Sequence, residues 1–213
     1  MKKNTILLTI AAILIAAAVY FVTSKNNSTI NKELRDFALA DTAAVTRIFL
    51  ADKGGKSVEL ERKSTGLWMV NNKYPARQDA INTLLFTIKA IEVRSPVGKA
   101  AYQNVMKQLS SSATKVEIYE GDKHVKTYYV GAATQDLLGT FMYLENSTVP
   151  FVIHIPGFNG YLSTRYFTDV KDWRSQVIFS YTENTIRKVV AKNLLEPYNS
   201  FRVEKVGEEY RYF

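Results

Sequence analysis

An uncharged stretch of 21 residues near the start of the chain, residues 4–24, constrains the fold more than any other feature. A helix of this length, rising about 1.5 Å per residue, spans roughly 31 Å. That length matches a bilayer hydrocarbon core of about 30 Å. Residues 6–22 are almost entirely aliphatic or aromatic. We therefore expect residues 1–24 to form a signal anchor that crosses the lipid bilayer through residues 4–24.

Two lysines, Lys2 and Lys3, precede this stretch. The positive-inside rule then keeps the N-terminus in the cytoplasm and sends residues 25–213 across the membrane in a single pass. One alternative is a cleaved signal peptide with its cleavage site near Ser24. The other is a helix buried in a soluble core.

The net charge is +8, and removing the two lysines of the anchor leaves +6 for the remainder. The basic residues are scattered, which favours an ordinary solvated surface; anionic lipid or acidic glycan is the alternative partner. We expect no nucleic acid partner for an exported chain. The chain has no cysteine, which excludes disulfides, thiolate metal sites and a cysteine nucleophile.

Alternating apolar residues predict three strands in residues 45–70. Turn-forming residues at 52–55 and 65–66 separate these strands, as in a β-meander. From Arg77 the period becomes helical, with a stripe through Ile81, Leu84 and Ile88. A second helix follows Pro96, and the two helices are expected to form a helical hairpin on the sheet.

Strand patterns return in residues 115–155 and are linked by hairpin turns. Strands followed by helices and then by further strands indicate an α+β fold with mostly antiparallel sheets. We expect a tether at 25–44 and the α+β domain at 45–180. Residues 181–213 repeat the alternation of the first meander and are expected to begin a second meander repeat. Three alternatives remain: the segment pairs back onto the domain, the native protein is longer, or the similarity arises by chance.

Motifs for known chemistry are absent from the sequence. His124 and His154 do not fit a zinc-protease spacing, and no nucleophile elbow, P-loop or dinucleotide-binding glycine pattern occurs. A glycosidase would need two converging carboxylates, for which the sequence offers Asp136, Glu145, Asp169 and Asp172 without favouring any pair. We expect no catalytic residue, no cofactor and no metal.

The strongest candidate interaction surface lies in residues 158–174, where aromatic and arginine side chains follow glycine-containing turns. Such residues dominate binding hot spots, and an exposed Arg165 would bind an anionic group through two hydrogen bonds. The alternative is an aromatic corner of the core, with Arg165 paired to Asp169 or a backbone carbonyl. The candidate residues are Phe158, Tyr161, Arg165, Tyr166, Asp169, Trp173 and Arg174.

Several motifs between residues 45 and 179 carry a family resemblance. They are Arg47-Ile48-Phe49-Leu50-Ala51-Asp52, residues 67–76, 116–119, 126–131, 134–136 and 139–140, His154-Ile155-Pro156-Gly157-Phe158, residues 159–162, and Arg165-Tyr166-Phe167. On these motifs the chain resembles a Bacteroidota-type domain-of-unknown-function family of N-terminally anchored envelope proteins. Some longer relatives are encoded near gliding-type ABC-transporter auxiliary proteins. The resemblance implies an inner-membrane anchor and a periplasmic bulk, and it carries over no catalytic residue.

Together these observations predict a membrane-anchored periplasmic interaction or accessory module of an envelope assembly, non-enzymatic and linked to an ABC transporter. Its partner would be another envelope protein. The alternative function is a periplasmic glycan- or peptidoglycan-binding protein or hydrolase. A third hypothesis is a purely structural domain.

Overall fold

The computed structural model describes residues 13–17, 19, 36–181 and 185–213. The predicted anchor lies largely outside these residues, as does the predicted tether up to residue 35; residues 13–17 and 19 are helical. None of the helices within the described ranges combines the length and the apolar character needed to cross a membrane. The chain divides into two compact units, residues 1–175 and 176–213.

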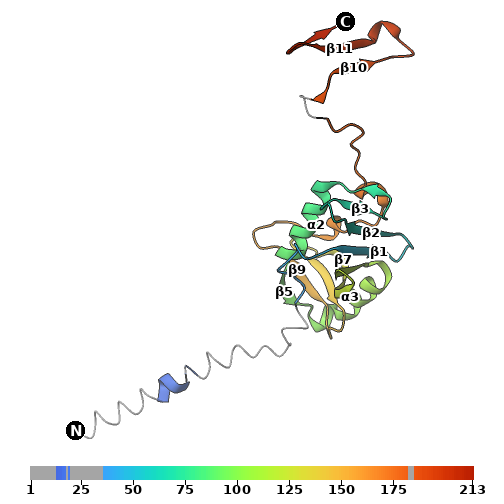
Figure 1. The fold of residues 1–213 in the computed structure, drawn as a ribbon. Coiled ribbons are helices and arrows are strands. Elements are labelled where there is room, and N and C mark those ends of the chain that lie inside the picture. Colours follow the sequence, from blue (N-terminus) through green and yellow to red (C-terminus); the bar gives the residue numbers. More distant parts are fainter. Residues whose placement is uncertain (1–12, 18, 20–35, 182–184) are drawn as a thin grey trace, which may run out of the picture. The chain divides into compact units, whose positions relative to one another are not determined.

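The first unit is built on a nine-stranded sheet in the order β4-β3-β2-β1-β6-β7-β8-β9-β5 (Figure 1). Every pair of neighbouring strands is antiparallel. The α+β class with mostly antiparallel sheets is therefore confirmed. The strands are β1 (Arg47–Ala51), β2 (Ser57–Arg62), β3 (Trp68–Val70), β4 (Tyr74–Pro75), β5 (Glu92–Pro96), β6 (Thr114–Glu120), β7 (Lys123–Ala133), β8 (Thr140–Leu144) and β9 (Phe151–His154).

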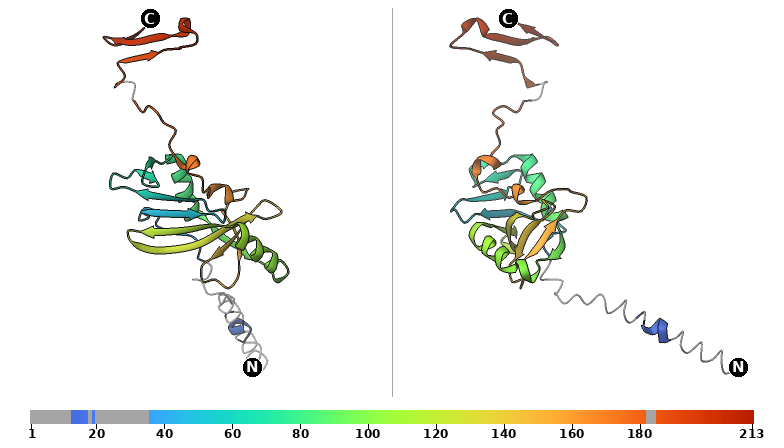
Figure 2. Two further views of the ribbon diagram at one scale, coloured as in Figure 1. Left: turned by 90° about the vertical axis from the view of Figure 1, so that its right-hand side faces the viewer. Right: turned by 180° about the vertical axis from the view of Figure 1, so that it is seen from behind.

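Two helices, α2 (Gln78–Ala90) and α3 (Lys99–Ser112), cover opposite faces of this sheet (Figures 1 and 2). The apolar stripe of α2 shares one core with Tyr128 of β7, while Leu109 of α3 belongs to a second cluster with Tyr129. Successive side chains of a strand point to opposite faces, so these neighbouring tyrosines mark the two sides. The predicted helical hairpin is wrong, because β5 pairs with β9 between the helices and leads the chain from one face to the other.

The start of the first unit lies earlier than the sequence suggested. Phe37 is only 1% exposed and belongs to the α2-side core. Its ring contacts those of Phe151 and Tyr128 at centroid distances of 5.7 and 6.2 Å. Lys126 of β7 binds the same segment to the sheet. Its ammonium donates to the carbonyls of Asp36 and Ala38 at 2.7 and 2.5 Å. Residues that the sequence assigned to a tether thus complete the core.

The second unit contains a three-stranded antiparallel sheet of β10 (Lys188–Ala191), β11 (Phe201–Val206) and β12 (Glu209–Tyr212). A short 3-10 helix, η4 (Pro197–Asn199), precedes β11. The strand order is the order along the chain, as it is for β1, β2 and β3. We call β10–β12 the second meander and β1–β3 the first meander.

Candidate functional site

Two of the seven predicted surface residues are buried in the first unit. Tyr166 is 2% exposed and Trp173 is fully buried. The indole Nε1 of Trp173, in α4 (Val170–Trp173), donates to the carbonyl of Phe167 at 2.8 Å, and the two rings lie 4.2 Å apart. Neither side chain can contact a partner, so their assignment to an interaction surface was wrong. The alternative, an aromatic corner of the core, describes them.

Tyr166 meets Tyr128 inside this core. The hydroxyl of Tyr128 donates to the hydroxyl of Tyr166 at 3.2 Å, and the rings pack edge to face. Burial raises the pKa of both hydroxyls above the usual tyrosine value, so both stay protonated at neutral pH. The pair satisfies the polar ends of two buried rings and leaves no acid or base available for chemistry.

Arg165 holds the loop of residues 156–162 against α2. It lies in η2 (Ser163–Arg165), and its Nη1 donates to Thr87 Oγ1 at 2.9 Å. Its guanidinium carbon lies 4.4 Å from the ring centroid of Phe158, which is 37% exposed. The Phe158 ring covers Gly160 so closely that a Cβ there would lie 2.8 Å from it. Arg165 therefore pairs with Thr87, and the expected partner, Asp169, lies elsewhere.

Asp169 and its neighbour Thr168 connect the segment to the turn between β1 and β2. The Asp169 carboxylate accepts from the backbone N–H of Lys171 at 3.0 Å and pairs with Lys56 Nζ at 3.3 Å. Thr168 Oγ1 donates to Asp52 Oδ2 at 2.6 Å. This hydrogen bond is the largest cause that lowers the pKa of Asp52 below its usual range, and bonds from the turn backbone add to it.

A Thr168→Val variant is expected to raise the pKa of Asp52 towards its ordinary value near 3.9. A depressed carboxyl pKa stabilises the fold above the unfolded-state pKa, and this contribution disappears as the pH falls through the folded-state pKa. The variant should therefore lose no more than about 1 kcal/mol at pH 7, because solvent screens this partly exposed group. The charge-dependent part of that loss should vanish at an acidic pH below the lowered folded-state pKa of Asp52. Urea unfolding at both pH values measures this, with the exposed Thr164→Val as the matched control; a loss that does not change with pH would contradict it.

Arg174 lies at a third place, beside the edge strand β4. Its guanidinium carbon is 5.2 Å from the ring centroid of Tyr74, and its backbone forms a bridge with Ala76. The backbone N–H of Ser175 also donates to the carbonyl of Pro75 at 2.8 Å, which covers this edge of the sheet. The seven predicted residues thus lie in the core, against α2, at the β1–β2 turn and beside β4. They form no single exposed patch, and Tyr161, on the loop of residues 156–162, is half-buried.

Two of the four carboxylates that the hydrolase alternative would use, Asp136 and Asp169, have pKa values lowered by their hydrogen-bond partners. Asp136 pairs with Arg94 at 3.3 Å and accepts from Thr134 Oγ1 at 2.5 Å, and its pKa is lowered. The pKa of Asp169 is lowered as well. A general acid in a glycosidase needs a raised pKa. In the described part of the chain, no three histidine or carboxylate residues gather in a cluster that could hold a metal ion.

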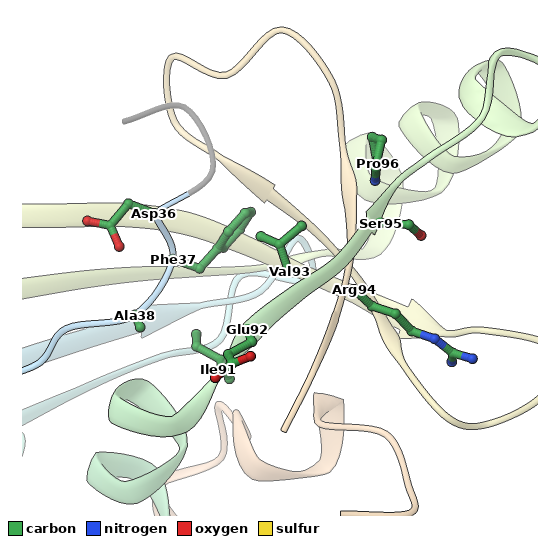
Figure 3. Close-up of a pocket in the computed structure, with 9 residues that line it drawn as sticks. All are labelled: Asp36, Phe37, Ala38, Ile91, Glu92, Val93, Arg94, Ser95 and Pro96. Atoms are coloured by element: carbon green, nitrogen blue, oxygen red, sulfur yellow. The ribbon is translucent and has the colours of Figure 1, made fainter. Parts of the chain in front are cut away.

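An open groove of about 560 Å³ lies between residues 36–38 and the edge strand β5 (Figure 3). Phe37 and Val93 point towards each other across it, while Arg94 points away (Figure 3). A bulge interrupts the register between Val93 and Ser95, and Pro96 has no N–H to donate. Bulges and prolines protect edge strands from pairing with another chain. The groove is therefore a poor site for adding a strand.

The second meander carries the most distinctive surface of the chain. Cross-strand partners share a face, so the pairings Val189↔Val203 and Val203↔Tyr212 place these three side chains together. The Phe201 and Tyr212 rings stack there at 5.9 Å, and Lys205 lies at the rim beside Tyr210. We call this surface the apolar face of the second meander. It comprises Val189, Ala191, Phe201, Val203, Tyr210 and Tyr212.

The opposite face of the second meander mixes paired charges with three exposed apolar side chains, Val190, Val206 and Phe213. Glu204 lies 4.0 Å from Lys188 Nζ and 3.7 Å from Arg202 Nε. The guanidinium of Arg202 also lies 4.5 Å from the ring centroid of Phe213. Charges that pair within one face are typical of a solvent-facing surface. The charged residues of the meander therefore gather on this opposite face, whereas Lys205 is, within the described strands, the one charged residue on the apolar face.

Exposure separates the two meanders. Ile48, Leu60 and Val70 of the first meander are fully buried in the core that α2 completes. Their counterparts in the second meander include Val189 at 44% and Tyr212 at 73% exposed. No described residue in 186–213 is buried. Sequence reasoning predicted a meander in this segment but missed this face, although the alternation Phe201, Val203 and Tyr210, Tyr212 was the available sign.

Comparisons of the chain with protein-family models, with curated proteins and with solved structures found no match. The envelope-protein resemblance thus stays a prediction.

Proposed function

We propose that this chain is a membrane-anchored, periplasmic interaction module of an envelope assembly, linked to an ABC transporter and without catalytic activity. In this proposal residues 4–24 hold the chain in the inner membrane. The second meander contacts another envelope protein through its apolar face. The exposure of that face is the observation that carries the proposal.

Two physical arguments support an interaction role. A contiguous exposed apolar surface bordered by charged residues is typical of a protein contact site. Tyrosine and phenylalanine, which supply half of this face, are also enriched in the centres of interfaces. By contrast, Asp136 and Asp169 pair with Arg94 and Lys56, and hydrogen bonds lower the pKa of both carboxyls, which does not favour the hydrolase alternative.

The exposed rings of Phe201, Tyr210 and Tyr212 also suit a glycan, since flat aromatic surfaces stack on sugar rings. A glycan is therefore the second candidate ligand. A protein partner is favoured because the aliphatic side chains of Val189 and Val203 share the face with these rings and offer no hydrogen bond to a sugar.

The test is cross-linking of the full chain in the membrane of the cells that produce it. A photoreactive group is placed at Tyr212, and the captured protein is identified by mass spectrometry. Capture of a defined envelope subunit should fall at least about tenfold when Val203 becomes aspartate, because a buried charge opposes the contact. Arg202→Asp is the matched control on the opposite face and should retain capture.

Reciprocal capture from the tagged subunit must give the same dependence on Val203. Capture that is equal in both variants would contradict the proposal. Recovery of glycan alone, with the same loss in Val203→Asp, would establish the second candidate instead.

A further inference from the structure

We infer that the partner of the second meander presents an amphipathic α-helix, which lies across the apolar face as α2 lies across the first meander. The inference rests on the proposed function, because it names the contact element of the same site. It follows from three observations. The two meanders pair their strands in the same register, their corresponding faces carry similar residues, and the helix α2 packs on that face of the first meander.

The two meanders pair their strands in the same register. In the first meander Ile48 faces Leu60, which faces Val70. In the second meander Val189 faces Val203, which faces Tyr212. Both form one apolar row across three strands.

The neighbouring rows correspond as well. Arg62 faces Trp68 in the first meander, and Lys205 faces Tyr210 in the second. A basic residue and a large aromatic residue thus recur as cross-strand partners at the same corner.

In a third row, the two paired side chains differ in size between the meanders, but the differences compensate each other. Leu50 faces Val58 in the first meander, whereas Ala191 faces Phe201 in the second. One side chain becomes smaller as its neighbour becomes larger, so the row keeps about the same total volume. Volume-conserving exchanges of this kind are those that a packed surface tolerates best. The second meander therefore presents a surface built to be packed against.

The first meander shows what fits such a surface. Ile81, Leu84 and Ile88 of α2 are all fully buried in the core with Ile48, Leu60 and Val70. Residues spaced by three and four lie on one face of a helix, and their stripe fills the apolar rows of the sheet. A partner helix needs the same stripe, with Leu, Ile or Val at positions i, i+3 and i+7.

The cation on the rim favours a helix over a second copy of this chain. Lys205 lies on the same face as Tyr210, with its ammonium 5.6 Å from that ring. Two copies packed face to face would cover both Lys205 ammonium groups with apolar surface, which is costly for an unpaired charge. A helix, about 10–12 Å across, leaves the rim open to water. An acidic side chain on its flank would pair with Lys205.

The experiment uses the full chain in lipid nanodiscs and a fluorescent peptide with the sequence of residues 77–91, which carries the α2 stripe. Anisotropy measures binding, with empty nanodiscs as the background. We expect saturable binding that weakens at least about tenfold in Val203→Asp and in a peptide with Leu84→Asp and Ile88→Asp. Arg202→Asp, on the opposite face, should change the affinity less than about twofold. Tyr212→Ser, at an exposed position, serves as a second apolar-face variant in case Val203→Asp disrupts the sheet.

Binding that ignores both face variants, or that survives loss of the peptide stripe, would overturn the inference. A single Tyr212→Cys in this cysteine-free chain gives the other decisive result. Disulfide formation between two copies would show that a second copy covers the face, and a cross-link from this cysteine to the first unit, formed with a thiol-reactive photo-cross-linker, would show an internal cover. If a protein is captured in cells through the face but the peptide does not bind, the helix is refuted while the interaction module stands.

Discussion

Replacing Trp173 with alanine is expected to lower the free energy of unfolding of the first unit by about 3–5 kcal/mol. The indole is fully buried, stacks near Phe167 at 4.2 Å and donates to the Phe167 carbonyl at 2.8 Å. Removing it leaves a large cavity and takes the indole donor away from the partly buried Phe167 carbonyl, and both changes destabilise the fold. Trp68, which is only 4% exposed in β3, remains as the fluorescent reporter for denaturant unfolding.

Two comparison variants make this test specific. Arg174→Ala changes the adjacent, exposed residue and should alter the free energy of unfolding by no more than about 0.5 kcal/mol. Trp173→Phe keeps most of the apolar volume and should lose less than the alanine variant. An alanine variant as stable as Arg174→Ala would show that the segment from Phe158 to Arg174 is a surface element after all.

Replacing Phe37 with alanine is expected to cost about 3–5 kcal/mol as well. The ring is 1% exposed and packs edge to face against Phe151 at 5.7 Å. The loss should appear in the same cooperative transition that Trp68 reports, because Phe37 belongs to the core that contains β3. Denaturant unfolding of the full chain, with the midpoint and slope compared with those of the wild type, measures it.

The neighbouring Asp36 supplies the control. Its carboxylate lies 3.5 Å from Lys126 Nζ, but its side chain is 62% exposed. Asp36→Ala should therefore cost less than about 1 kcal/mol, as exposed ion pairs usually do. Equal effects of the two variants would mean that residues 36–44 are a tether whose apolar contacts add nothing to the folded unit.

Local periodicity explains what could be predicted. The alternation in residues 45–70 gives the strands of the first meander, and the stripe of Ile81, Leu84 and Ile88 gives the buried side of α2. The backbone geometry of strands and helices sets these periods. The patterns can therefore be recognised in the sequence without knowing which elements pack against each other. The hairpin links likewise predicted the antiparallel sheet.

The residues of the candidate site were harder to assign. An aromatic residue and an arginine in a loop have no period, so their sequence does not distinguish a hot spot from a core corner. Contacts distant in the sequence decided between them: Arg165 with Thr87, Thr168 with Asp52, and Tyr128 with Tyr166. The passage of the chain across the sheet edge at β5, which separates α2 from α3, is also a long-range pairing.

The two meanders show most clearly which properties follow from the sequence and which depend on the tertiary structure. By itself, the sequence determined that both have one apolar side, because side chains alternate along every strand. Only the tertiary structure decided that Ile48, Leu60 and Val70 are buried by α2 while Val189 and Tyr212 remain exposed. The physical reason is that alternation defines which side of a sheet is apolar, whereas burial depends on a second element that packs against that side from elsewhere.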